Sequence, residues 1–429
     1  MKSKTSKFFS KYEPPSMVPP IDIFWKKAKG ANIWDEKGKK YIDFTSTIFV
    51  TSIGHSNPKF KSKIKEVLNS PLSHSYTYYN KFRKEYVNKL IKFVGKKKLN
   101  KCFFMSSGTE STEVAIKLLR LNALKKNPNK KGIIAISGNW HGRTMGAQML
   151  SDNKQQSSWI TSKDKSIYHI DFPYPWIKGF DDEPFFKKTI SKKFSRKFNF
   201  KKNIAGIMLE AFQGWGAFFY PKNYIRNLIK FAKKNNILIA IDEMQSGFGR
   251  TGKKFGFEHY SFVPDIVCCG KAMGSGLPIS GVISSKKIMD VEDGNLQSTH
   301  SGNPLSCAAG IATLDEINRL NLVKASEKKG KLMIKQLNII MNDNRDLISH
   351  VTGKGLIAAL IFRKSNGTSA SKLATDVCLI CKQKGLLLVN TNRDSIKFGP
   401  PLVISEKDII NSMKILSDSI KQIKKKNGN

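Results

Sequence analysis

The sequence predicts an α/β protein in which helices cover a mostly parallel sheet, together with a second, smaller α+β domain. One observation is the length of 429 residues, which exceeds what a single hydrophobic core usually supports. Another is a series of short, continuously apolar runs rich in β-branched residues, which is typical of strands buried on both faces of a parallel sheet. The third is that helical patterns alternate with these runs.

The order of these elements predicts two domains. Runs of strand length stand at GIIAIS (132–137), IAGIMLE (204–210), ILIAIDE (237–243), DIVCCG (265–270) and ISGVISS (279–285). With helical stretches such as TEVAIKLLRLNALKK and YIRNLIKFAKKNN, they predict a large domain over residues 60–320. Three later helical stretches, with the strand-like GLIAALIF and LLLVN among them, predict a small domain over residues 321–429 that residues 1–59 join.

The large positive charge does not by itself indicate a nucleic-acid partner. The formal net charge is +41, but lysines are spread over nearly every segment and arginine is scarce. Nucleic-acid binding favours clustered arginine with stacking aromatic rings. We therefore expect the densest lysine runs, at Lys96–Lys98, 191–202 and 421–429, to be solvated. A nucleic-acid binder that kept the fold and lost its chemistry is the alternative from another class of protein.

Other features of the composition indicate the setting of the protein. No run of 18 apolar residues is present, and the basic N-terminus lacks the apolar core of a signal peptide, so we expect no membrane association. The six cysteines show no disulfide framework, which favours a reducing, cytoplasmic setting. Cys378 and Cys381 form a lone C-x-x-C that we interpret as helix spacing rather than a metal site.

Three features of the large domain indicate chemistry, and the first is a helix start. In MSSGTESTEVAIKLLR (105–120), Ser107 and Glu110 have the spacing of a capping box. Gly108 would let the backbone approach a ligand closely. The free amides of the first helical turn would then bind an anion such as phosphate.

The other two features follow buried strands. In ILIAIDEMQSGFGRTG (237–252), Asp242 and Glu243 end a strand at the sheet edge where ligands bind in α/β folds. The pair could serve a metal, but no histidine or further acid stands at ligand spacing nearby, so we expect no metal site. Lys271 follows the strand DIVCC at the same edge, where desolvation would lower its pKa and suit a lysine that forms a Schiff base.

An anion cradle, a strand-end acid and a strand-end lysine together match the needs of pyridoxal phosphate. Its phosphate must be anchored, its ring nitrogen kept protonated and its aldehyde tethered. The sequence resembles the class-III aminotransferases, fold-type-I pyridoxal-phosphate enzymes that include 4-aminobutyrate, ornithine and acetylornithine aminotransferases. The resemblance extends from residues 25–58 to 396–405 and includes the family signature over 237–282. It implies a mostly parallel, seven-stranded sheet and a small domain built from both termini.

The resemblance also implies roles for individual residues around the cofactor. Lys271 resembles the lysine that holds the cofactor and shuttles the proton, and Asp242 resembles the acid on the pyridine nitrogen. Gln245 resembles the residue near the ring hydroxyl. Trp140, in GNWHGRTMGA (138–147), resembles the aromatic side chain that stacks on the ring.

The resemblance also implies which residues bind the phosphate of the cofactor and which bind the substrate. Gly108 and Thr109 resemble the phosphate binders. Thr299 resembles a threonine that reaches the phosphate from the partner subunit, which implies a homodimer with shared active sites. Arg143 resembles the arginine that holds a substrate carboxylate, and Ile48 falls where the family lines its substrate pocket.

Two positions depart from the family members that use glutamate. Those members pair a glutamate with an arginine near the C-terminus, and the pair acts as a switch that frees the arginine for an α-carboxylate. Here Trp215 stands at the position of the glutamate, and Lys397 stands at the position of the arginine. Glu210, in LEA, still resembles a residue that supports the cofactor-binding residues from behind. Tryptophan offers a cation only its ring face, and lysine lacks the planar fork that grips a carboxylate. Two amino acceptors therefore remain open: pyruvate, and 2-oxoglutarate bound in a different way from that in the glutamate-dependent members.

The predicted function is transfer of an amino group from the end of a small amine or ω-amino acid, 4-aminobutyrate-like, to a 2-oxo acid. The transfer would follow a ping-pong cycle through Lys271. An amino-acid racemase or decarboxylase on the same core is the alternative, because the lysine, the acid and the cradle serve any carbanion at Cα.

Overall fold

The computed structural model describes residues 4–14, 16, 23–363 and 367–426 of the chain. Parts of the predicted N-terminal segment (1–3, 15 and 17–22) and of the lysine-rich tail (427–429) therefore lie outside the described residues. No helix within the described ranges has both the length and the apolar character needed to cross a membrane.

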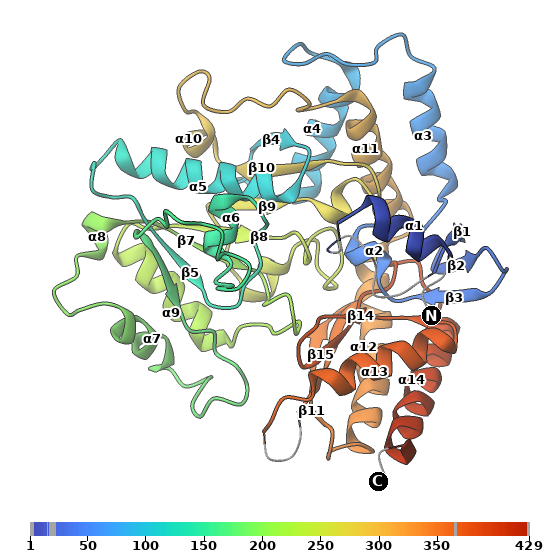
Figure 1. The fold of residues 1–429 in the computed structure, drawn as a ribbon. Coiled ribbons are helices and arrows are strands. Elements are labelled where there is room, and N and C mark those ends of the chain that lie inside the picture. The colour runs from blue at the N-terminus through green and yellow to red at the C-terminus, as the bar shows by residue number, and fades with distance from the viewer. Residues whose placement is uncertain (1–3, 15, 17–22, 364–366, 427–429) are drawn as a thin grey trace.

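A seven-stranded sheet forms the centre of the large domain (Figure 1), and its strand order is β4-β10-β9-β8-β7-β5-β6. The bounds are β4 (Lys101–Met105), β5 (Gly132–Ile136), β6 (Ile167–Ile170), β7 (Ile204–Glu210), β8 (Leu238–Asp242), β9 (Ile266–Cys269) and β10 (Ser280–Ser284). Strand β10 runs antiparallel to both β4 and β9, and the other strand pairs of the sheet are parallel. The prediction of a mostly parallel sheet from the apolar runs is therefore confirmed.

Side chains of this sheet alternate between two hydrophobic clusters, as the pleat of a strand requires. On one face, Ile133 and Ala135 of β5 pack in a cluster with α5 (Gly108–Leu124). On the other face, Ile134 and Ile136 belong to the main core. Apolar residues of α4 (Lys81–Val94), α9 (Lys222–Lys234) and α11 (Pro304–Arg319) belong to the same core. Burial on both faces explains why these strands are continuously apolar.

The other elements of this half are short or peripheral. They are α3 (Pro58–Leu68), α6 (Met145–Leu150), α7 (Phe185–Lys193), α8 (Phe200–Asn203), α10 (Lys286–Met289), and the 3₁₀ helices η1 (Gly256–Tyr260) and η2 (Lys271–Met273). The lysine-rich stretch at 191–202 is mostly exposed, as the sequence predicts.

The two ends of the chain meet in the small domain. The N-terminal strands β1 (Trp25–Lys29), β2 (Asn32–Asp35) and β3 (Lys40–Asp43) form a sheet with β13 (Leu386–Leu387), which pairs in parallel with β3. The pairing joins the N-terminal segment to the C-terminal part of the chain, and the domain bounds of 1–59, 60–320 and 321–429 stay a prediction.

A second four-stranded sheet completes the C-terminal half, in the order β11-β12-β15-β14. Its strands are β11 (Ile348–Lys354), β12 (Ile357–Phe362), β14 (Val389–Asn390) and β15 (Ser395–Phe398). The helices α12 (Leu322–Asn342), α13 (Ser371–Gln383) and α14 (Glu406–Lys426) lie together at the lower right of Figure 1. The short helices α1 (Lys4–Tyr12) and α2 (Ser46–Phe49) belong to the N-terminal segment. Cys378 and Cys381 are both buried in α13, where the C-x-x-C spacing is helical.

Candidate active site

The lysine and the acid predicted at one edge of the sheet do lie there. Strands β8 and β9 are parallel neighbours, and Asp242, the last residue of β8, pairs with Cys268. Lys271 is separated from β9 by Gly270 alone and begins η2 with a φ of +24°. A positive φ is uncommon outside glycine, and such strain costs about 1–3 kcal/mol and gathers at functional sites.

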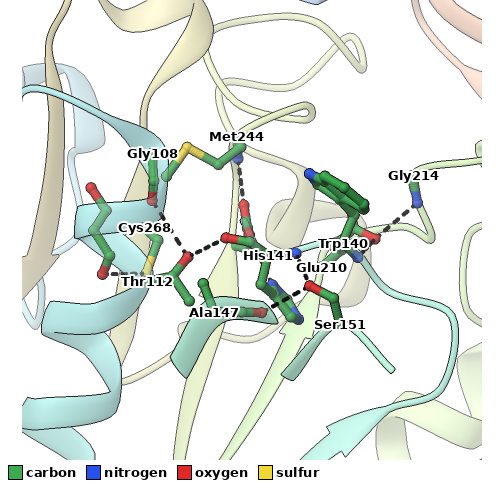
Figure 2. A network of polar contacts seen from close by, with 12 residues as sticks. Gly108, Thr112, Trp140, His141, Ala147, Ser151, Glu210, Gly214, Met244 and Cys268 are labelled. Carbon is green, nitrogen blue, oxygen red and sulfur yellow. Dashed lines mark hydrogen bonds and ion pairs between the residues drawn. The ribbon is translucent and has the colours of Figure 1, made fainter. Parts of the chain in front are cut away.

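A histidine that the sequence analysis missed holds the acid in place. The Asp242 carboxylate is buried, with Oδ2 2.9 Å from Nδ1 of His141, and Oδ1 accepts a 2.9 Å hydrogen bond from the Met244 amide. Figure 2 shows His141 between the Thr112 hydroxyl, which donates to its carbonyl at 2.9 Å, and the Ser151 hydroxyl, which accepts from its amide at 2.8 Å. In the sequence, the only indication of this role for His141 is its place next to Trp140 in GNWHGRTMGA.

Glu210 joins two loops of the site. It ends β7 directly beside Asp242, and its Oε2 accepts hydrogen bonds from the amides of Trp140 and Gly214, both at 3.0 Å (Figure 2). Its Oε1 accepts from Nε2 of Gln245 at 3.2 Å. Burial raises the pKa of Glu210 to about 7, and the charge of Asp242 adds to this effect. Glu210 thus ties the loops of Trp140, Gly214 and Gln245 to the edge of the sheet.

Lys397 is the most deeply buried amine of the site. It stands on β15 with 6% of its surface exposed, whereas Lys271 is half-buried. Its Nζ donates to Oε1 of Gln245 at 2.9 Å and lies 4.7 Å from the ring centre of Phe49. Burial lowers the pKa of Lys397 to about 7; the charge of Glu210 opposes this shift, and those of Lys271 and Arg393 add to it.

Trp215 offers its ring to a cation, but the cation is not Lys397. The guanidinium of Arg393 lies 5.4 Å from the centre of the indole. The Trp215 Nε1 donates to Oε1 of Gln213 at 2.8 Å and to the Tyr174 hydroxyl at 3.2 Å. The two positions of the family switch therefore have separate partners in this chain.

The start of α5 has the features of an anion cradle. Glu110 Oε2 accepts from the Ser107 amide at 2.6 Å, so the predicted capping interaction is present. A Cβ on Gly108 would stand 2.8 Å from the sulfur of Met244, so a side chain at this position would have to displace the Met244 side chain in the loop that follows Asp242. The hydroxyl of Thr109 lies 2.6 Å from that of Thr144, in the loop that carries Arg143.

These residues fit pyridoxal phosphate by their chemistry. An amine, a buried carboxylate oriented by a histidine, and a helix start with free amides meet at one edge of the sheet. The Ser275 hydroxyl, in the turn after Lys271, is buried without a partner among the described residues. Within the same part of the chain, no three His, Cys, Asp or Glu side chains gather as metal ligands would.

Two of the predicted residues are not brought to this centre. The Ile48 side chain is 49% exposed on α2, although α2 itself packs against η2. Thr299 lies on an exposed turn between α10 and α11. Arg143 is also exposed, but its guanidinium lies 4.9 Å from the ring centre of Trp140 and therefore stands at the site.

Known proteins are similar to this chain over nearly its whole length. The model of the family "Aminotransferase class-III" matches residues 14–420. Acetylornithine aminotransferase of Caldanaerobacter subterraneus is 32% identical over 405 residues, which cover 94% of this chain and 95% of that protein. Ornithine aminotransferase of Saccharomyces cerevisiae is 33% identical over 418 residues, with 94% of each chain covered.

A solved structure has the same fold. Ornithine aminotransferase of Toxoplasma gondii, described with partial occupancy of PLP at its active site, aligns with a TM-score of 0.87 and 24% identity. The alignment covers 100% of this chain and 97% of that one.

Proposed function

The chain belongs to the class-III aminotransferase family, which depends on pyridoxal phosphate, and from this premise we propose which amino group it moves. The donor is a small amine or ω-amino acid that gives up its terminal amino group to a 2-oxo acid in a ping-pong cycle. The observation that carries the proposal is the shared sheet edge of Lys271 and Asp242, with His141 holding the acid. The relatives named for ornithine and acetylornithine favour a donor that has a carboxylate at the end opposite the amine.

Each residue of the site would have a separate task. Lys271 would hold the cofactor through its aldehyde, Asp242 would face the pyridine nitrogen, and Trp140 would cover the ring. The α5 start at Gly108 and Thr109 would bind the phosphate. When bound, the cofactor supplies an electron sink for the negative charge that develops on the carbon bearing the amine.

The proton transfers fall to Lys271. Its side chain is half-buried at the sheet edge, so its Nζ can take a proton from the carbon that bears the amine and return it later. Arg143, held over Trp140, would bind the donor carboxylate through its planar fork. Gln245 would face the cofactor while Lys397 fixes its amide oxygen.

We further propose a homodimer in which Thr299 completes the phosphate site of the partner subunit. The turn that carries Thr299 lies beside the α3–α4 connection, because the rings of His74 and His300 are 5.5 Å apart. Large apolar side chains are exposed in and next to that connection, at Leu68, Tyr76, Tyr78 and Tyr79, and Tyr79 is 98% exposed. A patch of this kind is typical of a protein–protein interface. All six cysteines are free, which favours the cytoplasmic setting expected from the sequence.

Absorbance tests the cofactor assignment. Protein loaded with pyridoxal phosphate should show an absorption band that borohydride bleaches, and Lys271→Ala should lose the band while it keeps its fold. Lys192→Ala serves as the control that keeps the band, because Lys192 is an exposed lysine paired with Asp171 at the surface. An unchanged band in Lys271→Ala would refute the assignment of this lysine.

A product assay tests the reaction. Terminal amines such as 4-aminobutyrate, ornithine and acetylornithine are each incubated with pyruvate or 2-oxoglutarate, and new alanine or glutamate is measured. We expect product from at least one of these donors. Loss of optical purity or carbon dioxide release without any new amino acid would favour the racemase or decarboxylase instead.

A further inference from the structure

Arg393 places a cation beside a tryptophan of the site. It stands in the turn between β14 and β15, with its guanidinium over Trp215. Across residues 4–14, 16, 23–363 and 367–426, no carboxylate forms an ion pair with it. The carboxylate of its neighbour Asp394 has other partners. Its Oδ2 lies 3.4 Å from Nε of Arg363, and its Oδ1 accepts a hydrogen bond from the Ser369 hydroxyl.

Trp215, on which Arg393 stacks, makes hydrogen bonds with three residues. The Trp215 indole donates to Gln213 and Tyr174, and the Trp215 carbonyl accepts a 2.7 Å hydrogen bond from the Ser395 hydroxyl. Ser395 is only two residues from Arg393, so the turn and the indole are held together. An indole attracts a guanidinium through its ring face and leaves the N–H donors of the fork available to a ligand.

Two such pairs flank the candidate active site. Arg143 lies over Trp140, and Arg393 lies over Trp215. Both tryptophan loops are tied to one carboxylate, because the amides of Trp140 and Gly214 donate to the same oxygen of Glu210. Arg393 is also near enough to Lys397 that its charge lowers the pKa of that amine, as the charge of Lys271 does. Arg393 also stands four residues before Lys397, whose Nζ contacts Gln245, and Gln245 and the Gly214 amide both bond to Glu210.

We propose that Arg393, held on Trp215, binds one carboxylate of a dicarboxylic 2-oxo acid, while Arg143 binds the other. The inference rests on the proposed function and identifies the acceptor as a dicarboxylate of the 2-oxoglutarate type rather than pyruvate. Guanidinium groups bind carboxylates bidentately, which Lys397 cannot do. With tryptophan in place of a glutamate at position 215, the substrate carboxylate meets no competing protein carboxylate there.

Arg363 provides a matched comparison for Arg393. Its guanidinium lies 4.0 Å from the ring centre of Trp176, so it makes the same kind of contact with the large domain. Unlike Arg393, it is paired with an acid, Asp394. If these stacked arginines served only to hold the two domains together, removal of either one would have similar effects.

Calorimetry on the pyridoxal-phosphate-loaded protein tests the proposal with two ligands that cannot react. Glutarate carries two carboxylates and butyrate one. Arg393→Gln should weaken glutarate binding by roughly 10- to 100-fold, the loss expected for one charge-assisted contact, and change butyrate binding by less than about 3-fold. Arg393→Lys should be intermediate, because the charge stays and the fork is lost. Arg363→Gln should bind both ligands as the unchanged protein does.

Three results would overturn the proposal: no glutarate binding by the unchanged protein, unchanged glutarate affinity in Arg393→Gln, or equal losses in Arg393→Gln and Arg363→Gln. Since neither ligand is a substrate, the measurement does not depend on turnover. A protein that binds glutarate through Arg393 but forms no amino acid from any donor would contradict the proposed function and leave this inference standing.

Discussion

At the scale of single residues, the site is built from ionisable groups that are buried and joined by hydrogen bonds. Lys397, Gln245 and Glu210 form one chain of contacts, at 2.9 Å and 3.2 Å. Burial disfavours the charged forms of both end members, so the pKa of Glu210 is raised to about 7 and that of Lys397 is lowered to about 7. Such groups make the stability of the protein depend on pH.

We expect the Lys397→Met substitution to abolish an increase in the free energy of unfolding that the unchanged protein shows as the pH rises. In the folded protein Lys397, with its pKa lowered to about 7, loses its proton near neutral pH, but in the unfolded chain it does so only near its ordinary pKa of 10.5. Between these values the unfolded state binds more protons, so the free energy of unfolding increases with pH. We expect the unchanged protein to gain about 2 kcal/mol from pH 8 to 10 relative to Lys397→Met, measured by urea unfolding.

The pH range of this comparison avoids the acidic groups of the site. Glu210 and Glu243, with pKa values raised to about 7 by burial, release their protons below it. The control is Lys192→Met, because Lys192 is exposed and should show no such difference. Parallel pH profiles of Lys397→Met and the unchanged protein would contradict the assignment.

At the scale of elements, α2 is a turn of left-handed helix. All four residues from Ser46 to Phe49 have φ between +45° and +68°, and the Phe49 amide donates to the Thr45 carbonyl at 2.9 Å. Left-handed helix costs about 1–2 kcal/mol per residue for L-amino acids. The turn places the Phe49 ring beneath both Lys397 and Arg250, which is a reason for the chain to keep this strain.

Ile48→Gly should stabilise the protein. Ile48 has a φ of +61°, which glycine adopts without strain, and its side chain is 49% exposed, so little burial is lost. We expect the free energy of unfolding to rise by about 0.5–1 kcal/mol. Ile339→Gly is the matched control, because Ile339 is 46% exposed within α12. There, glycine should lower stability by about 0.5–1 kcal/mol. A loss of stability at both positions would show that the turn is not strained.

At the scale of the whole molecule, one buried arginine joins three parts of the chain. Arg250 is 1% exposed and follows β8 in the large domain. Its Nη1 donates to the carbonyls of Leu356 at 2.9 Å and Pro400 at 2.5 Å, both in the small domain. Its Nη2 is 3.4 Å from the hydroxyl of Ser46 in the N-terminal segment. Arg250 therefore fixes the large domain, which carries Lys271, against the domain that carries Lys397.

Arg250→Ala should be strongly destabilising. It would leave two buried carbonyls without donors and open a void in the core between the domains, so we expect a loss of about 3 kcal/mol in the free energy of unfolding. Arg226→Ala is the control, since the Arg226–Glu183 pair is exposed and worth at most about 1 kcal/mol. Thermal midpoints of both variants, measured with bound pyridoxal phosphate, provide the readout. Equal midpoints would mean that Arg250 does not join the domains.

The sequence by itself determined the fold class and the main chemistry of the site. Each buried strand is a local apolar run, and a polar residue that ends such a run must emerge at the sheet edge. This rule placed Asp242 and Lys271 at one edge, and the capping spacing predicted where α5 begins. These features depend on neighbours along the chain and are therefore visible in the sequence.

Only the tertiary structure decided which distant side chains meet. Asp242 and His141 are 101 residues apart, Lys397 and Gln245 are 152 apart, and Trp215 and Ser395 are 180 apart. The cation on Trp215 is Arg393 rather than Lys397 because β15 directs Lys397 into the pocket while the preceding turn reaches the indole. Such pairings depend on how sheets and loops pack against one another, and no local pattern of residues specifies that packing.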